Sequence, residues 1–388
     1  MVKDWSKVRK IDFGRPLISE AEKGAVLRVL DSPQLVHGPV ASQFEMDFSI
    51  FLGGGFSTST SSATTALQLA YMVLGIGKGD EVIVTSLTHI ATANSIRAVG
   101  ATPVFVDVDL KTGNISSEQV KLAISDKTKA VCVVHYLGLP VDMTAIMEMA
   151  RTSNLYVIED CALALGSYYK GTHVGLIGDF GAFSFYPAKH ITTGEGGMLV
   201  SKNENLLIEA RKTKAFYYSK NIGERNVPGL YDIVGFGLNL RMSEIAAAIG
   251  VEQIKKLPTF LEIRSQNIDV LTEPIEADFG RFIPHIMQDG ISGNYCASFV
   301  LNEKYAAKRD SIILKLKDLD IGTSIYYPVA LPQSAYYKSN PHLSRKLDSS
   351  TAEILANSSI AFGVGPHLST EDMVHVRNQF DSVLKGFE

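Results

Sequence analysis

The sequence FSFYPAKHITTGEGG at positions 183–197 contains the most informative residues of this chain. A strand-like apolar run leads into a turn rich in threonine and glycine, and Lys189 lies at the junction between them. Burial at such a junction lowers the pKa of a lysine and makes its amine a better nucleophile and base. Ser184 precedes the lysine with a hydroxyl suited to a phosphate oxygen. We therefore expect Lys189 to be catalytic, although a lysine taken alone would more often be a surface residue.

A second candidate, Asp160, ends the earlier strand-like run VIED at positions 157–160. Ligands of parallel sheets bind beyond the carboxyl ends of the strands, so an acid at this position faces a ligand site. A lysine that forms a Schiff base and an aspartate that keeps a pyridine nitrogen protonated are what a pyridoxal phosphate (PLP) enzyme needs. The pair therefore predicts PLP, and the plainer alternative for Asp160 is a helix cap.

Composition excludes several other classes of protein. The 388 residues carry a formal net charge of -4, with 20% charged residues, so no basic surface favours nucleic acid or an anionic membrane. Residues 1–6 contain no apolar signal segment, and no run approaches the roughly 20 apolar residues of a membrane span. The three cysteines lack the paired spacing of a zinc site. We expect a cytoplasmic protein without a metal site.

Strand and helix patterns alternate between residues 62 and 200. Strands are predicted at 81–84, 104–107, 130–134 and 156–159, with helices at 62–70 and 92–99. Strands separated by helices indicate an α/β protein with a largely parallel, buried sheet. A helix at 243–256 suggests a division into a large domain, 1–257, and a small α+β domain, 258–388. The second contains a predicted strand at 297–301 and helices at 309–319 and 370–384.

Residues 62–65, Ser-Ala-Thr-Thr, precede a helix rich in alanine and leucine. The free N–H groups of a helix N-terminus and the nearby hydroxyls would form a phosphate cradle, although serine and threonine cap most helices. The nearby GIGKGD at 75–80 lacks the spacing of a dinucleotide fingerprint and follows a helix. We interpret it as a turn.

These motifs together resemble one known family, the DegT/DnrJ/EryC1/StrS family of PLP-dependent sugar aminotransferases. The resemblance rests on the segments above, on GLNLRMSEI at 237–245 and on GTSIYYP at 322–328, and it covers nearly the whole chain. It implies an α/β fold of fold type I, similar to aspartate aminotransferase. The large domain would have a seven-stranded, mostly parallel sheet, and the smaller C-terminal domain would be α+β.

The resemblance also assigns roles to individual residues. It implies that Lys189 is the Schiff-base lysine and Asp160 the partner of the pyridinium nitrogen. Further cofactor-binding residues would be Ala63, Thr64 and Ser184 at the phosphate, His89 stacked on the ring, and Asn239 reaching in from a neighbouring subunit. Substrate-binding residues would be Tyr326 and Arg241.

The implied reaction transfers an amino group from L-glutamate to a keto-sugar, either nucleotide-linked or acidic. The product would enter a surface polysaccharide, such as lipopolysaccharide, or a natural product, and two subunits would share their active sites in a homodimer. Three positions depart from the family pattern. Leu163 replaces the usual Gln or His near the cofactor's phenolic oxygen, and Tyr326 and Pro332 stand where His is frequent.

Two alternatives remain open at this stage. PLP-dependent sugar 3-dehydratases have a closely similar segment, but they carry histidine in place of the lysine, so Lys189 favours transamination. A non-catalytic relative that binds PLP or a sugar would need neither Lys189 nor Asp160, and this chain retains both.

Overall fold

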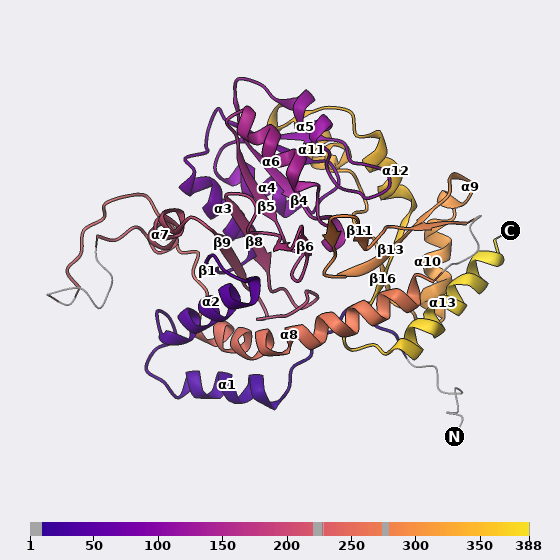
Figure 1. Cartoon of the computed structure of the whole chain (residues 1–388), viewed down its shortest axis with the longest axis horizontal. Coiled ribbons are helices and arrows are strands. Elements are labelled where there is room, and N and C mark those ends of the chain that lie inside the picture. The colour runs from indigo at the N-terminus through magenta and orange to yellow at the C-terminus, as the bar shows by residue number, and fades with distance from the viewer. Residues whose placement is uncertain (1–9, 220–226, 228, 274–278, 388) are drawn as a thin grey trace.

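The computed structural model describes residues 10–219, 227, 229–273 and 279–387 (Figure 1). A large α/β part lies at one end, a smaller part at the other, and the long helix α8 (Glu244–Leu271) runs along both. Residues 1–6, in which the sequence shows no signal segment, lie outside the described residues.

The main sheet has eight strands in the order β1-β9-β8-β5-β4-β2-β3-β15. Strand β9 is antiparallel to both of its neighbours, and every other pair is parallel. Seven strands match the expected sheet, and the eighth is the short edge strand β15. The bounds are β1 (Phe56–Thr60), β2 (Glu81–Thr85), β3 (Thr102–Val106), β4 (Thr128–Val134), β5 (Tyr156–Asp160), β8 (Phe180–Ser184), β9 (Gly197–Ser201) and β15 (Arg345–Lys346).

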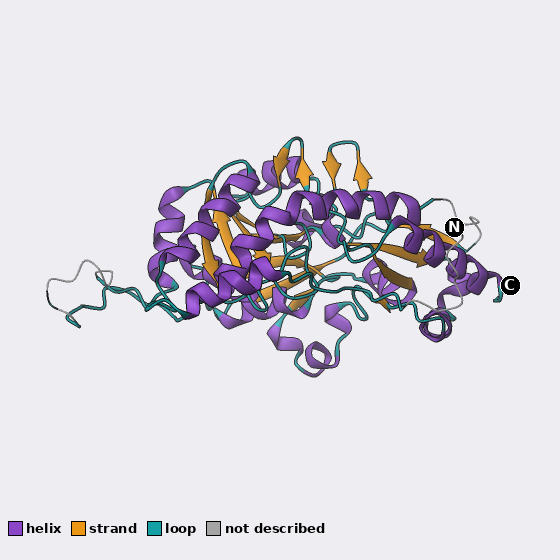
Figure 2. Cartoon of the chain, turned by 90° about the horizontal axis from the view of Figure 1, so that it is seen from below, coloured by secondary structure: helices purple, strands orange, loops and turns teal. Residues whose placement is uncertain are grey.

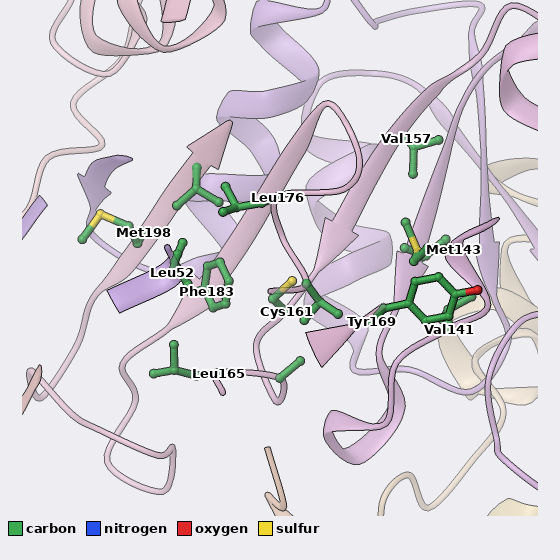
Figure 3. Close-up of a cluster of buried hydrophobic side chains, with 14 of the residues drawn as sticks. Leu52, Val141, Met143, Val157, Cys161, Leu165, Tyr169, Leu176, Phe183 and Met198 are labelled. Atoms are coloured by element: carbon green, nitrogen blue, oxygen red, sulfur yellow. The ribbon is translucent and has the colours of Figure 1, made fainter. Parts of the chain in front are cut away.

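Helices cover both faces of this sheet, as Figure 2 shows. Successive strand residues point to opposite faces, so in β2 Ile83 joins one core while Val82 and Val84 join the other. The Ile83 side is covered by α2 (Pro39–Leu52), α5 (Ser117–Ala123), α6 (Met143–Thr152) and α8. The other side is covered by α3 (Ala63–Val73), α4 (Ile90–Ala98), α7 (Glu204–Thr213) and α11 (Ala335–Ser339). Figure 3 shows part of the first core, with Phe183, Leu176 and Met198.

The smaller part is built on an antiparallel sheet of order β10-β13-β16-β14. Its strands are β10 (Gly280–Phe282), β13 (Cys296–Leu301), β14 (Thr323–Ser324) and β16 (Ser359–Gly363), and its helices are α9 (Glu303–Ala306), α10 (Arg309–Asp318), α12 (Ser350–Ser358) and α13 (Thr370–Lys385). A third small sheet links the parts through β6 (Tyr168–Tyr169), β7 (Thr172–His173), β11 (Ile286–Met287) and β12 (Gly290–Ile291). Helix α1 (Glu20–Leu30) packs on α8.

The helix expected to end at residue 256 continues to Leu271, and that prediction of its end was wrong. Pro258 lies inside the helix, where a proline removes one backbone hydrogen bond. The helix persists because it is buried in both parts: Leu257 and Phe260 pack in the core of the main sheet, and Leu271 packs in the core of the smaller part. The expected division near residue 258 therefore falls within a helix that both parts share.

The described residues contain no helix that is both long enough and apolar enough to cross a bilayer. The three cysteines, Cys132, Cys161 and Cys296, are buried free thiols, and Cys132 packs in the core.

Phe48 on α2 offers a test of this core. It is fully buried, and its ring contacts those of Phe44, Phe183 and Phe185. Phe48→Ala leaves a cavity, so we expect the free energy of unfolding to fall by about 3–5 kcal/mol, measured by urea denaturation. Leu122→Ala, at a side chain that is 72% exposed, is the control and should change it little. Equal losses in both variants would contradict this assignment of the core.

Candidate active site

Lys189 and Asp160 come together at the carboxyl edge of the main sheet. Strands β5 and β8 are parallel neighbours in which Asp160 pairs with Ala182, and Lys189 lies in the turn that follows β8. The Lys189 N–H donates to the carbonyl of Tyr186 at 2.8 Å, which fixes that turn. Burial lowers the pKa of Lys189 to about 8, while the carboxylate of Asp160 acts in the opposite direction. A neutral amine at Lys189 is therefore accessible near neutral pH.

The carboxylate of Asp160 is 7% exposed and held by two donors. The Thr92 hydroxyl donates to Oδ2 at 2.8 Å, and the Ala162 N–H donates to Oδ1 at 3.1 Å. A carboxylate has about four acceptor positions, so Asp160 retains capacity for one more donor. A protonated pyridine nitrogen is a donor that suits this acceptor.

The N-terminus of α3 has the properties of an anion site. Ser62 caps the helix by accepting from the Thr65 N–H, and the Thr65 hydroxyl accepts in return from the Ser62 N–H. The N–H groups of Ala63 and Thr64 have no hydrogen-bond partner among the described residues. Ser184 lies close by, because Thr60, Gly197 and Ser184 pair in one row across β1, β9 and β8.

Gly197 allows this close approach. A Cβ atom at position 197 would lie 2.4 Å from the Ser62 carbonyl carbon and 2.6 Å from the Ala63 nitrogen. A side chain here would push β9 away from the helix N-terminus and separate Ser184 from the free N–H groups. The site thus offers a partner for each end of PLP. The free N–H groups and the Ser184 hydroxyl match its phosphate, the Asp160 carboxylate matches its ring nitrogen, and the Lys189 amine matches its aldehyde.

His89 is the N-cap of α4, and its Nδ1 accepts from the Ala91 N–H at 3.2 Å. The pKa of His89 is lowered by desolvation and then by the charge of Lys189, with Asp160 opposing. All three side chains therefore share one site, with His89 neutral. The ring centroid of Tyr327 lies 6.0 Å from that of His89, which adds a second aromatic ring to the site.

Tyr295 is a site residue that the sequence did not reveal. The Lys189 Nζ lies 5.2 Å from the centroid of its ring, and its hydroxyl pairs with that of Tyr326 at 2.7 Å. Tyr295 is 4% exposed and immediately precedes the apolar strand β13, so sequence pattern alone would place it in the core. Tyr326, which is predicted to bind substrate, thus contacts Tyr295, whose ring lies beside Lys189.

The remaining residues that the sequence singled out are Leu163, Asn239 and Arg241. Leu163 is 3% exposed and packs in a cluster with Tyr136, so it presents no polar group. Asn239 is exposed, and its neighbour Leu240 accepts from the Ser61 N–H at 2.9 Å, beside the N-terminus of α3. The guanidinium carbon of Arg241 lies 5.3 Å from the centroid of the Phe216 ring. Arg241 also lines a cavity of about 950 Å³, together with the cations Arg211, Lys212 and Lys214.

A buried group of His135, Glu159 and Cys161 lies within reach of a single metal ion, but its polar atoms are already bonded. His135 Nδ1 accepts from the Val141 N–H, and Nε2 pairs with Glu159 at 3.0 Å. Glu159 also accepts from three backbone N–H groups of residues 175–178. Both ring nitrogens of His135 are therefore occupied, and Glu159 anchors the segment between β7 and β8.

The model of the DegT/DnrJ/EryC1/StrS aminotransferase family matches residues 16–381. This chain belongs to that family. It is 35% identical over 373 residues to GDP-perosamine synthase of Escherichia coli O157:H7, covering 95% of this chain and 97% of the relative. It is 34% identical over 381 residues to the spore coat polysaccharide biosynthesis protein SpsC of Bacillus subtilis, covering 97% of each chain.

Solved structures agree with this assignment. A putative sugar aminotransferase of Streptococcus pneumoniae in its PMP form superposes on this chain with a TM-score of 0.91 at 27% sequence identity. The superposition covers 97% of this chain and 100% of the other chain. An aminotransferase from Psychrobacter cryohalolentis superposes with a TM-score of 0.87 at 33% sequence identity, and the superposition covers 96% of this chain and 98% of the other chain. The protein is therefore a PLP-dependent sugar aminotransferase of fold type I, as the sequence motifs predicted.

The pKa of Lys189 gives a pH-dependent prediction. Only the neutral amine attaches to the cofactor aldehyde, so the rate of PLP incorporation into apoprotein should rise as pH passes through about 8. Asp160→Asn removes a charge that raises this pKa, so the midpoint should move to lower pH. Absorbance gives the rates, and borohydride reduction with peptide mapping identifies the modified lysine. A label on a different lysine would refute the assignment.

Gly197→Ala tests the phosphate cradle. The added Cβ overlaps the backbone of Ser62 and Ala63, so we expect the dissociation constant of PLP to rise by about tenfold or more. Gly77→Ala is the matched control, because its Cβ would meet its nearest atom at 3.5 Å. Equilibrium dialysis measures both, and unchanged binding in Gly197→Ala would place the phosphate elsewhere.

Proposed function

We propose that this protein transfers an amino group from L-glutamate to a keto-sugar, with Lys189 and Asp160 as its catalytic residues. The observation that carries the proposal is the meeting of Lys189, Asp160 and the free N-terminus of α3 at one edge of the sheet. An amine, a carboxylate and an anion site in this arrangement match the three ends of one cofactor. A protein that only binds a sugar has no need for a desolvated lysine beside a carboxylate.

PLP, when bound, supplies an aldehyde that carries the amino group and a ring that withdraws electrons from the substrate carbon. Lys189 would hold this aldehyde through its side-chain amine, and the same amine would move a proton between the substrate and cofactor carbons. Its lowered pKa suits this role, because an amine with a pKa of about 8 both accepts and returns a proton near neutral pH.

The remaining residues bind and orient the cofactor. Asp160 accepts the hydrogen of the ring nitrogen and keeps the ring in its protonated form. The N–H groups of Ala63 and Thr64, with the Ser184 hydroxyl, hold the phosphate. His89 covers one face of the ring and excludes water from it.

We propose that Tyr326 and Arg241 take part in recognising the sugar. The names of the Escherichia coli and Bacillus subtilis relatives support a nucleotide-linked keto-sugar whose product enters a surface polysaccharide. Leu163 leaves the cofactor's phenolic oxygen without the usual amide or imidazole partner, so an acidic keto-sugar is the second substrate class to test. We also propose a cytoplasmic location for the enzyme, as expected from the sequence.

We infer that two subunits complete each other's sites, with Asn239 contacting the partner's phosphate. Residues 229–236 include exposed apolar side chains that a monomer would leave in water, among them Leu230 (66%), Ile233 (64%) and Phe236 (76%). Light scattering of the purified protein should give the mass of a dimer.

The decisive experiment presents the PLP-loaded protein with L-glutamate and then with a panel of nucleotide-linked and acidic keto-sugars. We expect glutamate to change the absorbance of the cofactor, 2-oxoglutarate to be released, and one keto-sugar to gain an amino group by mass spectrometry. Lys189→Ala should lose the transfer, by at least about a thousandfold, and keep the fold. Full transfer by Lys189→Ala, or no amination of any sugar by the native protein, would reject the proposal.

A further inference from the structure

Helix α4 brings two side chains to the cofactor site from one short segment. His89 caps its N-terminus, and Thr92 lies one turn further along, where its hydroxyl donates to Asp160 Oδ2 at 2.8 Å. Thr92 is fully buried, so this hydroxyl has no contact with bulk water. A buried hydroxyl that donates to a carboxylate forms a charge-assisted hydrogen bond, which is stronger than a bond between neutral groups.

The hydrogen bonds around Thr92 have a defined direction. A carboxylate only accepts, so the single hydrogen of the Thr92 hydroxyl goes to Asp160. Thr88 lies 2.9 Å from the same hydroxyl and must therefore donate to it. The result is a buried chain in which Thr88 donates to Thr92 and Thr92 donates to Asp160. Donors in such a chain polarise one another and strengthen the final bond.

Two bonds fix the rotation of the Asp160 carboxylate. The Ala162 N–H holds Oδ1 from the strand side, and Thr92 holds Oδ2 from the helix side. Without Thr92 the group keeps one anchor at 3.1 Å and can turn about its Cβ–Cγ bond. We propose that Thr92 is a positioning residue that fixes the orientation of Asp160 toward the ring nitrogen of PLP, with Thr88 supporting it.

Other groups face Asp160 and set the background for any pH dependence. Lys189 and His89 approach from the cofactor side, and the remaining groups approach from the core: Tyr71 on α3, Cys132 on β4, Cys161 after β5 and Tyr327 from the smaller part. None of these makes a hydrogen bond to the Asp160 carboxylate, so the orientation depends on Thr92 and Ala162 among the described residues.

The test compares Thr92→Val, which keeps the shape and removes the hydroxyl, with Thr92→Ser, which keeps the hydroxyl. The primary measurement is a pH titration of PLP with an isotope-labelled ring nitrogen, followed by NMR in the holoenzyme. It depends on the family's cofactor and on neither the sugar nor the amino donor, so it stands apart from the proposed reaction. In Thr92→Val we expect the ring nitrogen to lose its proton at lower pH, because the misplaced carboxylate holds it less well.

Catalysis provides the second measurement. The rate constant of the reaction with glutamate should fall about ten- to a hundredfold in Thr92→Val, the loss expected for a hydrogen bond to a charged group, with little change in KM. Thr92→Ser should recover the native titration and most of the rate. Ser95→Ala is the matched control, because Ser95 is also buried on α4 but donates to the Thr92 carbonyl and does not contact Asp160.

Thr88→Val keeps the proposal testable if Thr92→Val does not fold. It removes the donor to Thr92 and leaves the bond to Asp160, so the titration should shift in the same direction by a smaller amount. The proposal is wrong if Thr92→Ser behaves like Thr92→Val, if Ser95→Ala shifts the titration equally, or if Thr88→Val and Thr92→Val both titrate like the native protein.

Discussion

A desolvated amine beside a carboxylate, at the carboxyl edge of one parallel sheet, is the constraint on which the rest of this site depends. Burial lowers the pKa of Lys189 to about 8, and the charge of Asp160 keeps it from falling further. The balance requires the two side chains to lie close together, because opposite charges act strongly only over a few ångströms. The parallel pairing of β5 with β8 meets that requirement.

Two other elements fit the site to a single cofactor. Gly197 lets β9 pass against the backbone of the α3 N-terminus, which brings the free N–H groups and Ser184 together. Helix α8 connects the site to the smaller part, since the buried Arg264 donates to the carbonyl of Tyr295 at 2.9 Å. The ring of Tyr295 lies in turn against Lys189. The smaller part therefore contributes directly to the environment of the Lys189 amine.

Membership of the family accounts for the cofactor and the reaction class. Leu163 and Tyr326 lie outside the strands β5 and β8: Leu163 is buried in an apolar cluster, and Tyr326 uses its hydroxyl to pair with Tyr295. We propose that side chains of this kind, and not the strands of the main sheet, determine the choice of sugar.

The sequence by itself determined the class of the sheet. It also predicted the roles of Lys189 and Asp160 and a phosphate motif at residues 62–65, because each prediction depends on short-range pattern: apolar strands, turn glycines and a helix cap. It misjudged the end of α8, since Pro258 is a local stop signal that burial on two cores overrides. It also missed Thr92 and Tyr295, which look like ordinary helix and core residues. Only the tertiary structure brings Thr92 within 2.8 Å of a carboxylate 68 positions away and Tyr295 against Lys189. Contacts between distant segments depend on strand order and packing, and no local pattern encodes them.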